Sequence, residues 1–167
     1  STDTNESVEL YNPTDHDIDI GGWQLKNYNQ DGDLWTTTTI DGDVSGTTII
    51  RSHGFYLVGE KNPLNSADWG GTSVTPDDVR DHATDWQNGP GDYMVLENSG
   101  GYVDGVRWGA KTSGSDIPDD PNYFDISPSD SIERKSGPTH DETQGNGYDT
   151  DDASNDCRTR GVPEPQN

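Results

Sequence analysis

The clearest structural information lies in residues 9–25, which read ELYNPTDHDIDIGGWQL. Apolar and polar residues alternate here, so that Ile18 and Ile20, and then Trp23 and Leu25, each share one face of an extended chain. The tetrapeptide NPTD and the dipeptide GG separate the runs, and both are typical of turns. The segment therefore predicts short strands with one face on a core.

The same pattern extends through most of the chain. Gly, Pro, Asn and Asp interrupt the sequence every few residues, and helical periodicity is rare. The turn NSGG predicts a hairpin between the last two apolar runs before residue 109. Because no helical crossovers are present to link parallel neighbours, an antiparallel β-sandwich is expected. Beyond the opening segment, extended runs fall at residues 34–40, 47–50, 54–59, 92–97, 102–108 and 131–135.

We expect one domain over residues 1–167, since this length suits a single core better than two. Its core strands fall within residues 7–109 and 131–135. Two long acidic loop insertions, 61–91 and 110–130, interrupt it, and a short helix is predicted over 77–85. Residues 136–167 are expected to pack on the domain or to be partly disordered.

The composition raises the question of whether the chain folds at all. Only 26% of residues are hydrophobic and the net charge is −22, which is near the range of disordered chains. Five Trp and seven Tyr, together with the alternating runs, favour a folded core. We assign Trp23 and Trp108 to that core, and expect Cys157 to be a small buried side chain.

The acidity also predicts an environment. Asp and Glu number 32 against 10 Lys and Arg, so the surface repels itself in dilute buffer, whereas molar salt screens this repulsion. A salt-loving source is the simplest interpretation; a Ca²⁺-loaded exterior protein is the alternative. Nucleic acid is not an expected partner because no basic stripe is present, and no apolar run approaches the ~20 residues of a membrane helix. We expect a soluble monomer.

This order of motifs resembles the lamin-tail domain family. The most specific match is the opening ELYNPT followed by IDIGGWQL, and later segments fall where that family places its later strands. The long acidic insertions and Cys157 depart from the family's pattern. The other matching segments are residues 54–58, 94–98, 103–109, 131–134 and 149–156.

The resemblance implies an immunoglobulin-like sandwich, found in nuclear lamins and as an accessory module of prokaryotic secreted or surface proteins. It implies a non-catalytic binding or structural module, outside the cell or on its surface, with a protein or polysaccharide partner. The alternatives are an accessory domain of a hydrolase or nuclease, and a Ca²⁺-stabilised adhesion module. A lamin-like role at DNA is disfavoured by the charge. Arg134 is expected either to pair with a carboxylate such as Glu9 or Glu97 or to be a solvated arginine.

Motifs for catalysis are missing from the sequence. Four histidines, His16, His53, His82 and His140, lie in polar, turn-like contexts without a nucleophile motif beside them. Paired carboxylates are so frequent that they do not single out a glycosidase site. We therefore expect that the chain is not an enzyme.

Calcium is the one cofactor that the sequence suggests, because hard cations favour oxygen ligands from short Asp-rich and Asn-rich loops. We predict at most one structural Ca²⁺ site, drawn from Asp31, Asp33, Asp41, Asp43, Asp149 and Asp151. For each of these aspartates the alternative is a hydrated loop or a turn stabilised by side-chain hydrogen bonds.

Three tryptophans in polar segments form a second candidate surface. Trp35, Trp69 and Trp86 are suited to stacking on sugars or anchoring a partner protein. The alternative is that they fill small hydrophobic clusters beneath long loops.

Overall fold

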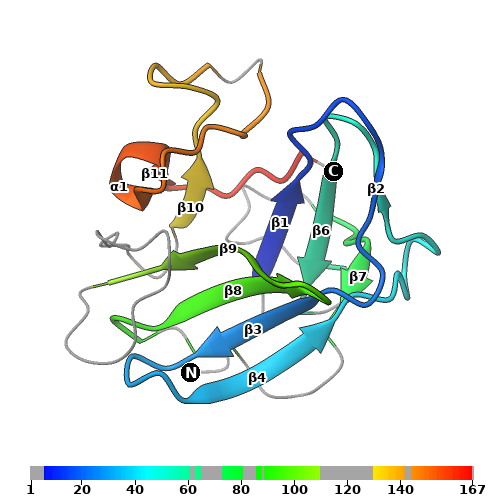
Figure 1. Cartoon of the computed structure of the whole chain (residues 1–167), viewed down its shortest axis with the longest axis horizontal. Helices are drawn as coiled ribbons and strands as arrows, with labels where there is room; N and C mark the ends of the chain where they lie inside the picture. The colour runs from blue at the N-terminus through cyan, green and yellow to red at the C-terminus, as the bar shows by residue number, and fades with distance from the viewer. Residues whose placement is uncertain are drawn as a thin grey trace.

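The computed structural model describes residues 6–60, 63–64, 73–80, 86–87, 89–109, 130–141 and 144–166, and there it is almost entirely β (Figure 1). The one helix in these ranges is α1, Ala153–Asp156. The strands are β1 (Ser7–Tyr11), β2 (Ile18–Asp19), β3 (Gln24–Tyr28), β4 (Leu34–Thr39), β5 (Ile49–Ile50), β6 (Phe55–Gly59), β7 (Asp78–Val79), β8 (Tyr93–Asn98), β9 (Gly101–Arg107), β10 (Ser131–Arg134) and β11 (Cys157–Arg160).

Two sheets form the sandwich, as predicted. One is the antiparallel sheet β4-β3-β8-β9, and the other is β1-β6-β7, with the small pair β2-β5 beside them. The predicted hairpin is present as β8 and β9. One pair departs from the antiparallel prediction, because β7 lies parallel to β6. The immunoglobulin-like all-β class is confirmed.

The core lies between these sheets. Leu25 of β3 and Met94 of β8 come from one sheet and meet Tyr56 and Val58 of β6 from the other. Trp23 packs against this cluster, as does Trp108, and both are partly buried. Each strand thus contributes the apolar face that its alternation predicts.

The opening motif has a clear structural role. Asn12 is buried, and its side-chain amide donates to the carbonyls of His16, Ile50 and Arg51 at 2.8–3.2 Å. Its Oδ1 accepts from the backbone N–H of Thr14 at 3.0 Å, which closes the NPT turn. This single side chain therefore fixes the β1–β2 connection against β5.

The helix predicted over residues 77–85 is wrong at its start. The backbone N–H of Asp77 donates to the Leu57 carbonyl of β6 at 2.8 Å, and its Oδ2 accepts from the Leu57 N–H at 2.9 Å. The acidic residues that suggest a helical first turn instead pair with β6, and Asp78–Val79 forms β7. Residues 81–85 lie outside the described part of the chain.

The C-terminal segment, of which residues 130–141 and 144–166 are described, lies along the open side of the sandwich between the edge strands β1 and β9 (Figure 1). Residues 131–134 form a strand as predicted, but β10 pairs with β11 rather than with the sandwich. The backbone N–H of Gln166 donates to Glu9 of β1 at 2.6 Å. No helix in the described residues is long and apolar enough to cross a membrane.

Candidate functional site

An acidic cluster brings together Asp41 and Asp43 of the β4–β5 loop and Asp78 of β7. One carboxylate oxygen of each lies within 4.8 Å of the other two. Asp41 and Asp43 are exposed, whereas Asp78 is fully buried. Carboxylates this close repel one another unless a proton or a cation lies between them.

Only one of the two carboxylate oxygens of Asp78 accepts hydrogen bonds from the described residues. Its Oδ2 accepts from the backbone N–H groups of Asp41 and Gly42 at 2.8 and 2.9 Å, and from the Tyr56 hydroxyl at 3.3 Å. Its Oδ1 is buried and has no hydrogen-bond partner in the described structure. Burial and the Asp78 charge both raise the pKa of Tyr56, so this hydroxyl stays a donor.

The loop that carries Asp41 and Asp43 has a defined shape. Gly42 has φ +71°, and a Cβ there would lie 2.7 Å from the Thr47 carbonyl oxygen, so only glycine fits. Asp43 accepts from the Val79 N–H at 2.9 Å, which fixes it beside β7. Burial raises the pKa of Asp43, and the neighbouring carboxylates of Asp78 and Asp41 add to the rise, while the Val79 bond opposes it.

The predicted pair Asp31 and Asp33 lies in a turn closed by side-chain hydrogen bonds. Oδ1 of Asn29 accepts from the backbone N–H groups of Asp31 and Asp33 at 3.0 and 2.9 Å. A turn stabilised by side-chain hydrogen bonds is the alternative to a metal-binding loop that the sequence analysis gives for these residues. Neither residue belongs to a group of three acidic or histidine side chains among the described residues.

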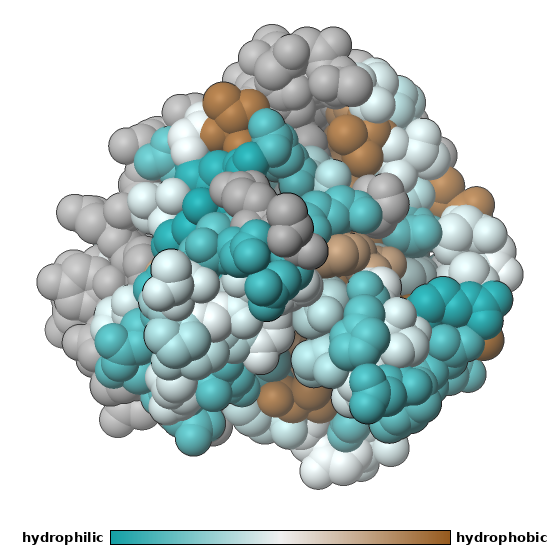
Figure 2. Space-filling model, turned by 90° about the horizontal axis from the view of Figure 1, so that it is seen from above, coloured by the Kyte–Doolittle hydropathy of each residue, from teal (hydrophilic) through white to brown (hydrophobic). Residues whose placement is uncertain are grey.

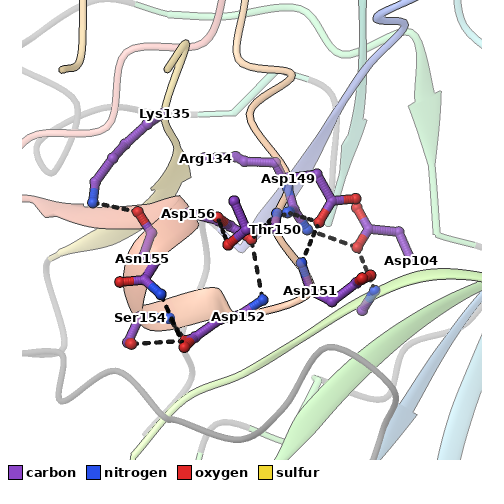
Figure 3. A network of polar contacts seen from close by, with 11 residues as sticks. Asp104, Arg134, Lys135, Asp149, Thr150, Asp151, Asp152, Ser154, Asn155 and Asp156 are labelled. Atoms are coloured by element: carbon purple, nitrogen blue, oxygen red, sulfur yellow. Dashed lines mark hydrogen bonds and ion pairs between the residues drawn. The ribbon is translucent and has the colours of Figure 1, made fainter. Parts of the chain in front are cut away.

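The predicted pair Asp149 and Asp151 lies in a network around an arginine, which Figure 3 shows. Arg134 of β10 reaches Asp104 of β9 at 2.7 Å, Asp149 at 3.3 Å and Asp156 at 3.7 Å. Asp149 Oδ1 also accepts from the Asp151 N–H at 3.1 Å. A guanidinium thus provides the positive charge at this cluster. Arg134 thus pairs with carboxylates, as one of the two expectations had it, but not with the two named as examples: Glu9 and Glu97 contact Gln166 and Lys26.

Asp156 is the buried anchor of the same network. It accepts from the N–H and hydroxyl of Thr150 at 2.8 and 2.7 Å and from the Asp152 N–H at 3.3 Å. Burial acts to raise the pKa of Asp156, but these hydrogen bonds and the Arg134 charge hold it below its usual value. The next residue, Cys157, is buried, which raises its pKa to about 11.

The three candidate tryptophans have different positions. Trp35, on β4, is 49% exposed. Trp86 is only 5% exposed and belongs to the main core, so it is not part of a binding surface. Trp69 lies outside the described residues. The sequence did not separate these positions because each tryptophan lies in a polar stretch, where local pattern does not report burial.

A cavity of about 410 Å³ lies where the C-terminal segment crosses the sandwich. Its lining combines the aromatic rings of Tyr11 and Phe55, whose centroids are 4.9 Å apart, with charged groups. On the face that Figure 2 shows, hydrophobic side chains form small separate patches among hydrophilic ones. The charged lining residues include Glu9, Asp104, Glu133, Asp149, Arg134 and Arg160.

Comparison with known proteins identifies one family. The model of the Lamin Tail Domain family matches residues 1–110, which include the opening motif and the strands through β9. The similarity of residues 131–134 and 149–156 to closing segments of that family lies outside the match and stays a prediction. A search of curated proteins finds no match.

Proposed function

The chain belongs to the lamin tail domain family, and we propose that it is a non-catalytic binding module of a secreted or cell-surface protein, with a neutral polysaccharide as its ligand. The family is one of immunoglobulin-like modules that are not enzymes, which supports the non-catalytic part of the proposal. The fold does not fix the ligand, because one sandwich serves many functions. The ligand is therefore argued from the cavity.

The observation that carries this proposal is the 410 Å³ cavity beneath the C-terminal segment. Its volume falls within the range of roughly 300–1,000 Å³ that is usual for ligand sites. Tyr11 and Phe55 supply ring surface for the apolar face of a sugar, and Glu9 and Asn146 supply groups that bond hydroxyls. Such a mixture of rings and polar groups suits a sugar better than it suits an apolar ligand.

The charge favours a neutral chain over an anionic one. Glu9, Asp104 and Glu133 are among the carboxylates of the lining, which outnumber its two guanidinium groups, Arg134 and Arg160. The chain as a whole carries −22. An acidic polysaccharide would meet repulsion over the whole surface, whereas a neutral polyol bonds without net charge. Sugar binding of this kind also persists in concentrated salt, where ionic attraction is screened.

The test is a titration with neutral hexasaccharides of glucan, xylan and mannan type in 2 M KCl, followed by calorimetry. We expect at least one to bind the wild type, and Phe55→Leu to weaken it by about tenfold, because the substitution keeps an apolar side chain but removes the ring. Tyr102→Leu is the matched control, since Tyr102 is an exposed aromatic residue of β9 outside the cavity lining.

Two results would overturn the proposal. One is the failure of all three hexasaccharides to bind folded wild type. The other is equal affinity in the wild type and Phe55→Leu. Binding of a Lys-rich peptide that disappears as KCl rises would point to a protein partner instead. Melting curves of both variants establish that each is folded before it is titrated.

A further inference from the structure

We propose that Asp41, Asp43 and Asp78 bind one Ca²⁺ ion, which ties the β4–β5 loop to β7. The site is separate from the cavity, so this proposal does not depend on the polysaccharide proposal. Asp41 and Asp43 are candidate ligands from the sequence; Asp78 comes from the structure, which places it beside them.

The first argument is the unsatisfied oxygen of Asp78. A fully buried carboxylate loses its hydration, and each oxygen then needs a donor or a cation. Oδ2 has three donors, but Oδ1 has none in the described structure. The three donors also hold the carboxylate in place, with one of its oxygens within 4.8 Å of a carboxylate oxygen of Asp41 and of Asp43. This arrangement is that of a preorganised ligand atom.

The second argument is distance. Oxygens that bind one Ca²⁺ lie about 2.3–2.6 Å from it, so two ligand oxygens are at most about 5 Å apart. The three carboxylate oxygens lie within 4.8 Å of one another, which meets this limit. Three carboxylates also give the negative charge that a divalent ion needs, and water completes the six to eight ligands that Ca²⁺ takes because Asp41 and Asp43 are exposed.

The third argument is the way in which the fold neutralises its other acidic clusters. Arg134 lies among Asp104, Asp149 and Asp156, at 2.7–3.7 Å. Arg80 lies between Glu6 and Glu60, at 3.5 and 3.1 Å. Both clusters thus contain their own cation.

By contrast, no side-chain cation pairs with Asp41, Asp43 or Asp78 in the described part of the chain. An ion from solution supplies the missing charge.

The test measures Ca²⁺ binding by calorimetry, and melting temperature, on chelator-treated protein at pH 7 in KCl of fixed ionic strength. We expect one Ca²⁺ per chain, and a melting temperature about 5 °C higher at a hundredfold excess over Kd. Asp43→Asn and Asp41→Asn are expected to weaken binding at least tenfold and to remove most of the shift. Both positions are exposed, so neither substitution disrupts the core.

The matched control is Asp33→Asn, which removes one exposed carboxylate from a turn outside the cluster. It is expected to leave the affinity and the shift unchanged. Equal responses in Asp43→Asn and the wild type would overturn the site and leave only diffuse counterion binding. Absence of any Ca²⁺ response, with stabilisation on lowering the pH to 5, would replace the ion by a proton shared between Asp43 and Asp78. Full occupation by Mg²⁺ at equal affinity would overturn the assignment to Ca²⁺.

Discussion

Arg134 of β10 donates to Asp104 of β9 across 2.7 Å, and this contact joins the C-terminal sheet to an edge of the sandwich (Figure 3). The same guanidinium lies 3.7 Å from Asp156, which is fully buried. Arg134 therefore connects β9, an edge strand of the sandwich, to Asp156 in the C-terminal segment. We expect this contact to hold the C-terminal segment against the sandwich.

Replacing Arg134 by Ala is expected to lower the free energy of unfolding by about 1–3 kcal/mol. This loss lies between the values usual for exposed and for fully buried ion pairs, because Arg134 is largely buried and Asp104 is half exposed. Limited proteolysis is expected to cut first within residues 130–166. Arg51→Ala, which removes an exposed pair with Asp17, is the control and should change stability by less than about 0.5 kcal/mol. Equal losses in the two variants would contradict this role of Arg134.

The ionised carboxylate of Asp156 is expected to raise the free energy of unfolding at neutral pH, and this contribution is expected to disappear in acid. Its folded pKa lies below the ordinary value of 3.8, so the ionised form stabilises the fold. This contribution is fully present above the unfolded pKa and is lost as the pH falls through the folded pKa. The difference in urea midpoint between wild type and Asp156→Asn should be largest at pH 7 and shrink below pH 4. A difference that stays constant over this range would contradict it.

Gly145 is expected to tolerate no side chain. A Cβ there would overlap the phenol ring and oxygen of Tyr11, because the C-terminal segment passes directly over β1. Gly145→Ala should destabilise by about 1–3 kcal/mol, as overpacking does, and Gly137→Ala should be neutral because a Cβ there makes only an ordinary contact, 3.8 Å from the Thr139 carbonyl oxygen. Combining Gly145→Ala with Tyr11→Ala should recover stability in a double-mutant cycle. An additive cycle would show that the strain lies elsewhere.

Salt is expected to stabilise the protein. At −22, self-repulsion opposes compaction in dilute buffer, and at 1 M salt the Debye length is only about 3 Å. The melting temperature should rise steadily from 0.1 to 3 M KCl. A melting temperature that falls with KCl would contradict the interpretation of the acidity as an adaptation to salt.

Cys157 is expected to be unreactive in the folded protein. It is 6% exposed, and burial raises its pKa to about 11, so little thiolate is present at pH 8. Reaction with a disulfide reagent should be about a hundredfold slower in the folded state than in denaturant. Similar rates in both states would mean that the C-terminal segment opens frequently.

The sequence predicts the strands of the sandwich well but says less about their partners. Alternation identifies the faces of β1, β3 and β8 that meet the core, because side chains on a strand alternate with a period of two. The same alternation in residues 131–134 carries no information on pairing, and β10 joins β11 rather than the sandwich. Pairing depends on contacts between residues far apart in the chain, which local pattern does not contain.

The candidate site was predictable only in part, for the same reason. Asp41 and Asp43 stand out because they flank a glycine in a loop, whereas Asp78 sits in a stretch that also fits the start of a helix. What makes Asp78 notable is that it is buried with one oxygen unsatisfied, and both facts are three-dimensional. Trp86 was a candidate for a binding surface for a similar reason: its neighbours in the sequence are polar, although its own side chain lies in the core.

The passage of residues 145–166 across β1 has a consequence for biosynthesis. β1 is synthesised well over a hundred residues before the segment that covers it, because Tyr11 contacts Gly145 and Gly147, and Glu9 accepts from the Gln166 N–H. Contacts of such long sequence separation close slowly. The edge of β1 therefore stays uncovered on the nascent chain until residues 145–166 leave the ribosome, and during that interval it is exposed to pairing with other chains.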